Sequence, residues 1–319
     1  MNLHQLTAVC GDEAKAIGLF ESLRWPNGPI CPHCQNPNID EPKRIYVLDG
    51  VKDKKGRVRL GLKKCGNCRR QFTARVGTIF EDSHIEIGKW LIAIYQMCSS
   101  KKGISAAQLQ RQLGMNYKSS WFMCHRIRLA MEQEPLASKL GRDGGIVEID
   151  ETVVGGKLKN NRHRNKTKLA GKKMTVLTLV DRDGDARTFP VPNAKKVTLQ
   201  AIARPHIDGI ANIITDENLA YSGIGDHFRS HHTVDHSKTF VRSVILHTNF
   251  AESYHSLLKR GIVGAFHHVS EHHLPRYLRE FEFRWNRRKE TDGARFAQAI
   301  NGSSGKRLMY RAPKRPIPR

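Results

Sequence analysis

The sequence is poor in acidic residues and has no long hydrophobic run. Its 319 residues include 30 Asp and Glu against 54 Lys and Arg, which gives a formal net charge of +24 at pH 7. The longest apolar stretches, Trp90–Ile94 and Val176–Val180, are far too short to cross a bilayer. The first twelve residues lack the basic and apolar regions of a secretory signal. We therefore expect a cytoplasmic protein without a membrane partner.

The shortage of acidic residues leaves an excess of positive charge, which costs stability because like charges repel each other in the compact state. Such an excess is typical of proteins that bind a polyanion, either nucleic acid or an acidic membrane. Hydrophobic residues make up 39% of the chain, which is too many for a disordered basic segment. Because the membrane class is disfavoured, the composition predicts a folded protein that binds nucleic acid.

Cysteine is scarce and odd in number, which argues against a disulfide framework. Four of the seven cysteines form two CxxC pairs, Cys31 with Cys34 and Cys65 with Cys68. Two such turns can direct four thiolates at one ion and close a tetrahedral site that leaves no position for water. We predict a structural Zn²⁺ site in a zinc ribbon. Four thiols that bind no metal are the alternative.

Changes in composition and periodicity divide the chain into five segments. We expect a zinc ribbon over 1–80, a helical segment over 81–133, a linker over 134–145, an α/β domain over 146–290 and a basic flexible tail over 291–319.

The helical segment has the outline of a helix-turn-helix motif. Ser105 is a good N-cap for a first helix, Gly114 interrupts the pattern, and 117–131 resumes it. We expect Arg126 and Arg128 to lie on the outer face of the second helix and to contact DNA. An ordinary helical hairpin that joins two domains is the alternative.

Acidic residues stand at three positions that point to metal chemistry. Asp150 ends one apolar strand and Asp216 ends another, while Asn249, Glu252 and Lys259 share one face of a helix over 249–260. Two neighbouring carboxylates repel each other unless a cation lies between them, and Mg²⁺ or Mn²⁺ prefers such oxygen ligands. Two ions about 3.5–4 Å apart can promote phosphodiester chemistry. Taken singly, these residues are also typical of strand ends, caps and a solvated helix face.

Several motifs together resemble a known family. They are Trp25–Cys34, Cys65–Cys68, Glu148–Gly156, Thr215–Glu217, His247–Gly261 and Phe281–Arg288. In this order they are similar to bacterial insertion-sequence DDE transposases of the zinc-ribbon, ISXO-like group. The resemblance covers about residues 15–290. It implies a nucleoid-associated enzyme that acts on double-stranded DNA. Its RNase H-like catalytic domain would follow a zinc ribbon and a helix-turn-helix-like segment.

The resemblance also implies roles for the acidic residues. Asp150, Asp216 and Glu252 match the catalytic triad that binds two Mg²⁺ or Mn²⁺ ions, and Lys259 matches the associated basic residue. Some members use another residue type at the third position, and Asn249 lies one turn before Glu252. We prefer Glu252 because a carboxylate is the better metal ligand. Asn249 is then an additional ligand or a group that orients Glu252.

A basic stretch follows Asp150 and is expected to rim the active site and hold DNA phosphates. Its residues are Lys157, Lys159, Arg162, Arg164, Lys166, Lys168, Lys172 and Lys173. The predicted activity is cutting at the ends of a mobile element and joining of the freed 3′-OH to target DNA, by a homo-oligomer assembled on DNA. The alternatives are a non-catalytic DNA-binding regulator and an RNase H-like nuclease or resolvase.

Overall fold

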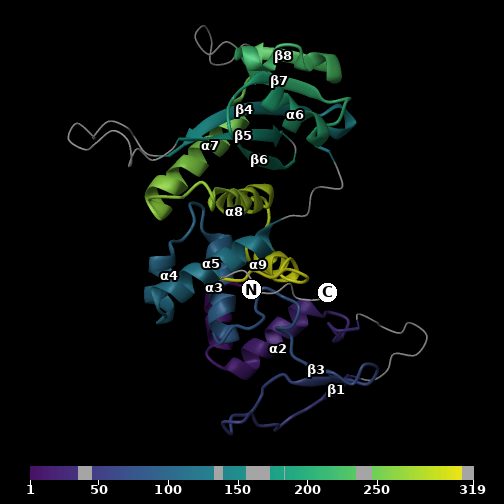
Figure 1. Cartoon of the computed structure of the whole chain (residues 1–319), viewed down its shortest axis with the longest axis vertical. Helices are drawn as coiled ribbons and strands as arrows, with labels where there is room; N and C mark the ends of the chain where they lie inside the picture. Colours follow the sequence, from purple (N-terminus) through teal and green to yellow (C-terminus); the bar gives the residue numbers. More distant parts are fainter. Residues whose placement is uncertain (35–44, 133–138, 156–172, 183, 235–245, 311–319) are drawn as a thin grey trace, which may run out of the picture. The chain divides into compact units, whose positions relative to one another are not determined.

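The computed structural model describes residues 1–34, 45–132, 139–155, 173–182, 184–234 and 246–310 (Figure 1). The chain forms two compact units. Unit 1 consists of Met1–Ser100, Ile104–Glu132 and Glu290–Arg319, and unit 2 consists of Lys101–Gly103 and Gln133–Lys289. None of the helices in the described part of the chain has the length and apolar character that a bilayer crossing requires.

Unit 1 contains helices and a small sheet. Its helices are α1 (Leu3–Cys10), α2 (Glu13–Arg24), α3 (Ile87–Ser99), α4 (Ala106–Leu113), α5 (Tyr117–Met131) and α9 (Asp292–Asn301). Its strands β1 (Ile45–Val47), β2 (Lys63–Cys65) and β3 (Gln71–Phe72) form an antiparallel sheet in that order. The apolar helix α3 contacts α1, α2 and α9, so it forms the centre of this unit.

Helices α4 and α5 are separated by a tight turn. The Ser105 side chain accepts a hydrogen bond from the Gln108 N–H and begins α4, and Gly114 ends it in a left-handed conformation with φ of 60°. The Asn116 side chain then accepts a hydrogen bond from the Ser119 N–H and begins α5. Local capping by these three residues therefore sets the boundaries of the two helices.

The outward direction expected for Arg126 and Arg128 is wrong. Arg126 is 6% exposed and Arg128 is 2% exposed. Arg126 donates hydrogen bonds to the carbonyl oxygens of Leu308 and Glu81, which lie far from it in the sequence. The second half of α5 is covered on more than one side, so helical periodicity does not reveal an exposed stripe. On α5 the exposed residues are Tyr117 and Lys118, in the first turn.

The basic tail expected over 291–319 instead begins with a packed helix. The Thr291 hydroxyl accepts a hydrogen bond from the Ala294 N–H and caps α9. Phe296 and Ile300 are buried on this helix, and the Phe296 ring packs against Tyr95 of α3 with a centroid distance of 5.8 Å. The apolar residues of this basic segment lie at helical spacing, so they form one buried face of α9. Residues 311–319 lie outside the described part of the chain.

Unit 2 is built on a mixed five-stranded sheet in the order β6-β5-β4-β7-β8. The strands are β4 (Ile146–Val154), β5 (Met174–Asp181), β6 (Ala186–Val191), β7 (Asn212–Asp216) and β8 (Ser230–Val234), and the helices are α6 (Lys196–His206), α7 (Asn249–Gly261) and α8 (Leu274–Asn286). Strand β4 lies at the centre, antiparallel to β5 and parallel to β7. This mixed sheet with its helices confirms the expected α/β class.

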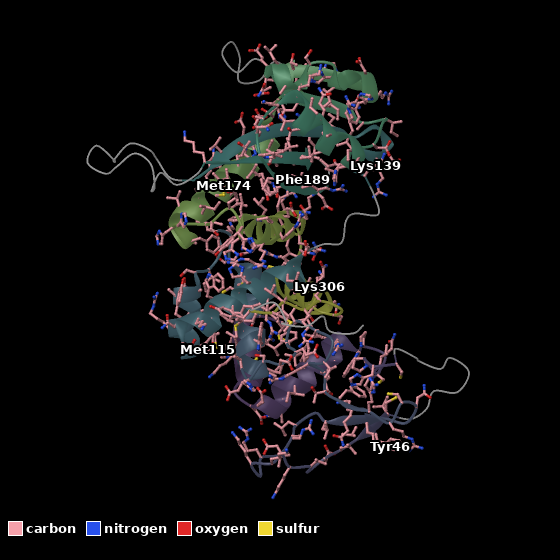
Figure 2. All side chains as sticks on the ribbon, in the orientation of Figure 1. Tyr46, Met115, Lys139, Met174, Phe189 and Lys306 are labelled. Carbon is pink, nitrogen blue, oxygen red and sulfur yellow. The ribbon has the colours of Figure 1, made fainter. Side chains whose placement is uncertain are left out.

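Helices cover both faces of this sheet (Figure 1). Because side chains alternate along a strand, Val147 and Ile149 of β4 pack on the α6 side, whereas Val154 packs on the side of α7 and α8. Met174 belongs to the apolar cluster on the α7 side, and Phe189 packs against the cluster on the α6 side (Figure 2). Even-numbered residues of β4 therefore face α7.

Part of the expected linker over 134–145 belongs to the core of unit 2. Leu140 is buried and pairs with Ile207 in an isolated parallel bridge. Gly141 has a φ of 72°, and a Cβ there would collide with the side chain of Ala211. Its N–H donates to Asp181 at 2.9 Å. Residues 133–138 lie outside the described part of the chain.

Candidate active site and zinc site

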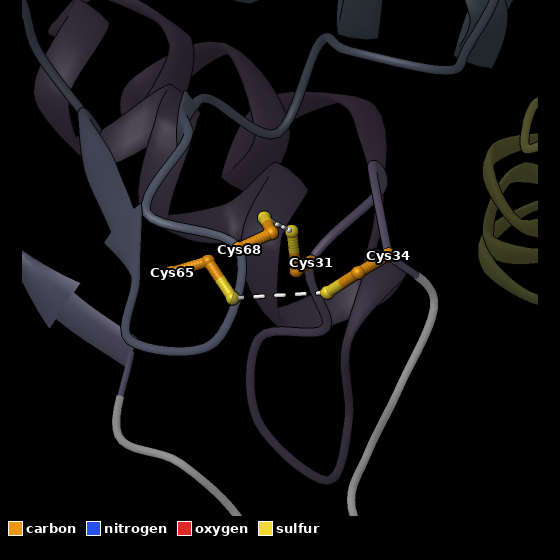
Figure 3. A group of neighbouring side chains, drawn as sticks. All are labelled: Cys31, Cys34, Cys65 and Cys68. Atoms are coloured by element: carbon orange, nitrogen blue, oxygen red, sulfur yellow. Dashed lines mark hydrogen bonds between the residues drawn. The ribbon is translucent and has the colours of Figure 1, made fainter.

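The two CxxC turns bring four thiols together in unit 1 (Figure 3). The four Sγ atoms all lie within 4.8 Å of one another, and Cys31 lies 3.6 Å from Cys68 while Cys34 lies 3.8 Å from Cys65. Sulfur atoms about 2.3 Å from a tetrahedral zinc ion lie about 3.8 Å apart, so this arrangement fits the ion. The predicted zinc ligands are therefore placed together in the geometry that structural Zn²⁺ requires.

Two of these thiols have opposite shifts in pKa. Burial raises the pKa of Cys31 to about 12. Burial would also raise the pKa of Cys65, but the backbone N–H groups of Cys68 and Asn67 outweigh it and lower that pKa to about 7. Backbone N–H groups that point at a sulfur stabilise the thiolate, which is the form that binds zinc.

Asp150 and Asp216 lie on adjacent parallel strands of unit 2. The last registered pair between β4 and β7 joins Ile149 to Thr215, and each aspartate is the next residue of its strand. Both therefore face α7, and both are half-buried. One carboxylate oxygen of Asp216 also accepts the N–H of Asn218 at 3.1 Å.

Helix α7 places a second group of expected residues opposite Asp150. An open cavity of about 450 Å³ is lined by Asp150, Glu151, Thr152, Glu252, His255, Ser256, Lys259 and Arg260. Glu252 and Lys259 are exposed on this helix and lie two turns apart, as expected from their spacing. Asp216 and Asn249 are not among the lining residues. The structure therefore brings Asp150, Glu252 and Lys259 to one cavity, with Asp216 beside Asp150.

The acidic residues are spread more widely than the cysteines. Among the described residues, the four cysteines alone form a group of three or more possible ligands whose atoms all lie within 4.8 Å. Asp150, Asp216 and Glu252 thus do not form a cage for one ion. A pair of ions about 3.5–4 Å apart needs a wider set of ligands, because the outer carboxylates contact different ions. Oxygen donors of this kind suit Mg²⁺ or Mn²⁺.

Sequence reasoning missed the role of Glu148, two residues before Asp150 on the same face of β4. Its side chain is fully buried and accepts hydrogen bonds from the N–H groups of Phe250 and Ala251 at 2.9 and 3.0 Å. These are orphan donors in the first turn of α7, where the N-cap Thr248 supplies no side-chain acceptor. Glu148 therefore fixes the start of the helix that carries Glu252.

The charge of Glu148 is balanced by Arg182, which follows β5. The guanidinium Nε donates to Glu148 at 2.7 Å, and Nη2 donates to the carbonyl oxygen of His247 at 2.6 Å. A glutamate in an otherwise apolar strand is a signal that sequence reasoning could have used, because such a charge is rarely buried without a partner. We refer to Glu148, Arg182 and the first turn of α7 as the Glu148 clamp.

Glu151 points away from Asp150, to the other face of β4. It accepts hydrogen bonds from the Tyr221 hydroxyl and from Asn218 Nδ2. Burial raises the pKa of Glu151, and the negative charges of Asp216 and Asp150 raise it further, against the opposing effect of Tyr221 and Asn218. Burial and Glu151 also raise the pKa of Tyr221. These contacts tie β4 to the turn that follows Asp216.

His255 is a second residue that sequence reasoning missed. It is 6% exposed on α7, one turn after Glu252. Its Nδ1 lies 3.3 Å from Asp150 Oδ2, and its Nε2 lies 2.9 Å from the Thr178 hydroxyl. The imidazole ring therefore lies between one expected metal ligand and a buried residue of β5.

Of the basic stretch that follows Asp150, the structure describes Lys173 alone. Lys173 is exposed just before β5. The other residues expected to bind DNA there lie outside the described part of the chain: Lys157, Lys159, Arg162, Arg164, Lys166, Lys168 and Lys172.

Two known proteins are similar to this chain. The chain is 26% identical over 286 residues to "Uncharacterized protein in transposable element ISH50" of Halobacterium salinarum, which covers 85% of this chain and 90% of that protein. A crystal structure of a pre-cleavage Mos1 transpososome is 12% identical and covers 65% of this chain and 76% of that chain. Its TM-score of 0.25 is too low to establish a shared architecture.

Two family models match the chain over more than half of its length. The transposase zinc-ribbon domain matches residues 11–71, and the ISXO2-like transposase domain matches residues 143–286. The first match and the four-cysteine cluster confirm the predicted zinc ribbon, and the second implies the RNase H-like fold for the mixed sheet of unit 2. The chain therefore belongs to the ISXO2-like transposases with an N-terminal zinc ribbon.

Proposed function

We propose that this transposase cuts DNA at the ends of its insertion sequence and joins the freed 3′-OH to target DNA by two-metal-ion phosphoryl transfer. The observation that carries the proposal is the placement of Asp150 beside Asp216 on adjacent parallel strands, with Glu252 and Lys259 on one cavity with Asp150. This arrangement places carboxylate oxygens that can bind divalent cations near a lysine that can bind phosphate.

Each side chain has a distinct role in this proposal. Asp150, Asp216 and Glu252 would hold two Mg²⁺ ions, which would supply Lewis-acid stabilisation of the attacking and leaving oxygens. Lys259 binds a non-bridging phosphate oxygen across the cavity. Asn249, at the exposed start of α7, is an additional ligand or orients Glu252.

The reaction has two displacements at phosphorus. First, a water oxygen attacks the phosphate at the element end, and the bond from phosphorus to the 3′ oxygen breaks to leave a 3′-OH. That hydroxyl then attacks a target phosphate, where a new phosphodiester bond forms as the target's own bond to its 3′ oxygen breaks. Bond number is conserved in the second step, so no external energy source is needed.

Binding to DNA is proposed to rest on the net charge of +24 and on the basic stretch from Lys157 to Lys173. Bringing two element ends together requires at least two active sites. We therefore expect at least a dimer on DNA that carries the ends, which light scattering of the complex measures.

The decisive experiment compares Asp150→Asn with Asp226→Asn, a matched change at an exposed acid of unit 2. The substrate is linear DNA that carries the sequences flanking this gene, incubated with Mg²⁺. We expect Asp150→Asn to lose cleavage on the order of 10³-fold or more, because an amide is a poor ligand for Mg²⁺. Asp226→Asn keeps wild-type cleavage. Both variants keep the wild-type melting temperature.

Gel analysis of the products separates the proposal from its alternatives. Full cleavage by Asp150→Asn would contradict the assignment of the site. Cleavage by the wild type without a joined product indicates a nuclease or resolvase, and tight binding without cleavage indicates a regulator. Parallel Asn249→Ala and Glu252→Gln variants identify the third ligand, because the larger loss marks it.

A further inference from the structure

His255 makes contacts that a core histidine does not require. Its side chain is 7% exposed, and each ring nitrogen faces a polar group of the sheet. Nδ1 lies 3.3 Å from Asp150 Oδ2, while Nε2 lies 2.9 Å from the hydroxyl of Thr178. Asp150 and Thr178 are themselves Cα partners in the antiparallel pair of β4 and β5. The ring therefore bridges two neighbouring side chains across the sheet.

The two contacts select one tautomer of the ring. Nδ1 lies within ion-pair distance of Asp150 Oδ2, so the tautomer with its proton on Nδ1 presents an N–H group to the carboxylate. Nε2 is then an acceptor, and the Thr178 hydroxyl donates to it. Thr178 is fully buried, so water does not compete for this hydroxyl.

The contact with Asp150 involves one carboxylate oxygen, Oδ2. A ring nitrogen against one oxygen restricts the rotation of a carboxylate and leaves its other oxygen to face a cation. His255 also lines the cavity that contains Asp150, Glu252 and Lys259. On α7 it lies three residues after Glu252 and four before Lys259, so its contact with Asp150 lies between these two residues along the helix.

We propose that His255 is a positioning residue that orients Asp150 for metal binding, with the Thr178 hydroxyl fixing the ring. This inference rests on the proposed function, because it takes Asp150 as a metal ligand. It assigns His255 no contact with DNA or with a reacting atom. The role differs from that of the Glu148 clamp, which holds the start of α7 and does not touch Asp150.

The test uses two variants of similar shape that differ in one donor. His255→Asn keeps an N–H donor near the position of Nδ1, whereas His255→Leu keeps the bulk without any donor. The zinc-loaded full-length protein is titrated with Mn²⁺, and free Mn²⁺ is followed by electron paramagnetic resonance. We expect His255→Leu to weaken Mn²⁺ binding about tenfold or more and His255→Asn to stay within about threefold of the wild type.

Thr178→Val provides a second test that does not disturb the helix. Valine has nearly the same shape as threonine but cannot donate to Nε2, so we expect Mn²⁺ binding to weaken by a few fold. If His255→Leu does not fold, as shown by the loss of its melting transition, Thr178→Val decides the outcome. Wild-type Mn²⁺ affinity in Thr178→Val would then contradict the inference.

The outcomes separate this inference from the proposed function. If Asp150→Asn binds Mn²⁺ as tightly as the wild type, the proposed metal site itself is wrong. If Asp150→Asn loses binding but His255→Leu does not, only the inference about His255 is wrong. Equal losses in His255→Leu and His255→Asn would also contradict it, because the donor at Nδ1 would then have no effect.

Discussion

The two ligand sites of this chain are built in opposite ways. The zinc site takes two cysteines from each of two CxxC turns, and its four sulfur atoms lie within 4.8 Å. The proposed carboxylate site takes single residues from β4, β7 and α7. Asp150 and Glu252 line an open cavity, and Asp216 lies on the strand beside Asp150. Residues close together in the sequence form each half of the zinc site. The packing of separate strands and a helix brings the carboxylates together. A closed site suits a structural ion, and an open site leaves room for DNA.

Zinc removal should produce the largest effect. Structural zinc in small domains contributes about 10–16 kcal/mol of apparent binding energy, so Cys65→Ser should unfold the zinc ribbon. We expect the metal content to fall from one zinc to none and amide hydrogen exchange to rise over residues 45–72. Exchange over β4–β7 should not change, because unit 2 has its own apolar clusters.

The half-buried Cys10 provides the control for this experiment, because it belongs to neither CxxC pair. Cys10→Ser should retain the full zinc content. Protection of the ribbon amides in zinc-free Cys65→Ser would mean that the ribbon folds without the ion, and the contrast between the two sites would then disappear.

The Glu148 clamp should produce the next largest effect. Glu148→Gln leaves the guanidinium of Arg182 largely buried without its charged partner, which costs about 3–5 kcal/mol. The start of α7 also loses an anionic acceptor, and a negative charge near a helix N-terminus stabilises the helix. We expect urea denaturation to report this loss for unit 2, together with faster amide exchange in the first turn of α7.

A double variant sharpens the interpretation of the clamp. Adding Arg182→Gln to Glu148→Gln removes the uncompensated charge, so part of the lost stability should return. If the loss of stability in the double variant equals the sum of the losses in Glu148→Gln and Arg182→Gln, the two residues act independently. The clamp would then not explain how α7 is held on the sheet.

The smallest effect concerns pH and Glu151. Burial raises its pKa in the folded protein, so folding is favoured by the protonated form. That contribution is complete below the ordinary pKa of a glutamate and is lost as the pH rises through the raised value. Glu151→Gln has no such loss. The melting temperature of Glu151→Gln should therefore rise relative to that of the wild type as the pH goes from acidic to neutral. A difference between the two proteins that does not change with pH would contradict the prediction.

Features that depend on nearby residues could be predicted from the sequence. The CxxC turns, the capping of α4 by Ser105 and the face shared by Glu252 and Lys259 all depend on short spacings. The strand-end positions of Asp150 and Asp216 are visible in the sequence, and the resemblance to transposases supports their pairing, but their proximity depends on the order of the strands.

Features that depend on distant contacts could not be predicted. Arg126 is buried because the carbonyl groups of Glu81 and Leu308 accept its hydrogen bonds. The partners of Glu148 lie about a hundred residues away in α7. A pattern within one helix or strand gives the direction of a side chain relative to its neighbours, but it does not show what covers that face.

The order of the segments in unit 1 has a consequence for synthesis of the protein. Helix α9 packs against α3 in unit 1, yet it follows all of unit 2 in the chain. Because a nascent chain emerges from the ribosome N-terminus first, the catalytic unit has its residues before the zinc-ribbon unit is complete. A message that ends before Asp292 would yield the catalytic unit joined to a zinc-ribbon unit with an uncovered apolar helix. Helix α9 thus makes completion of translation a condition for the finished zinc-ribbon unit.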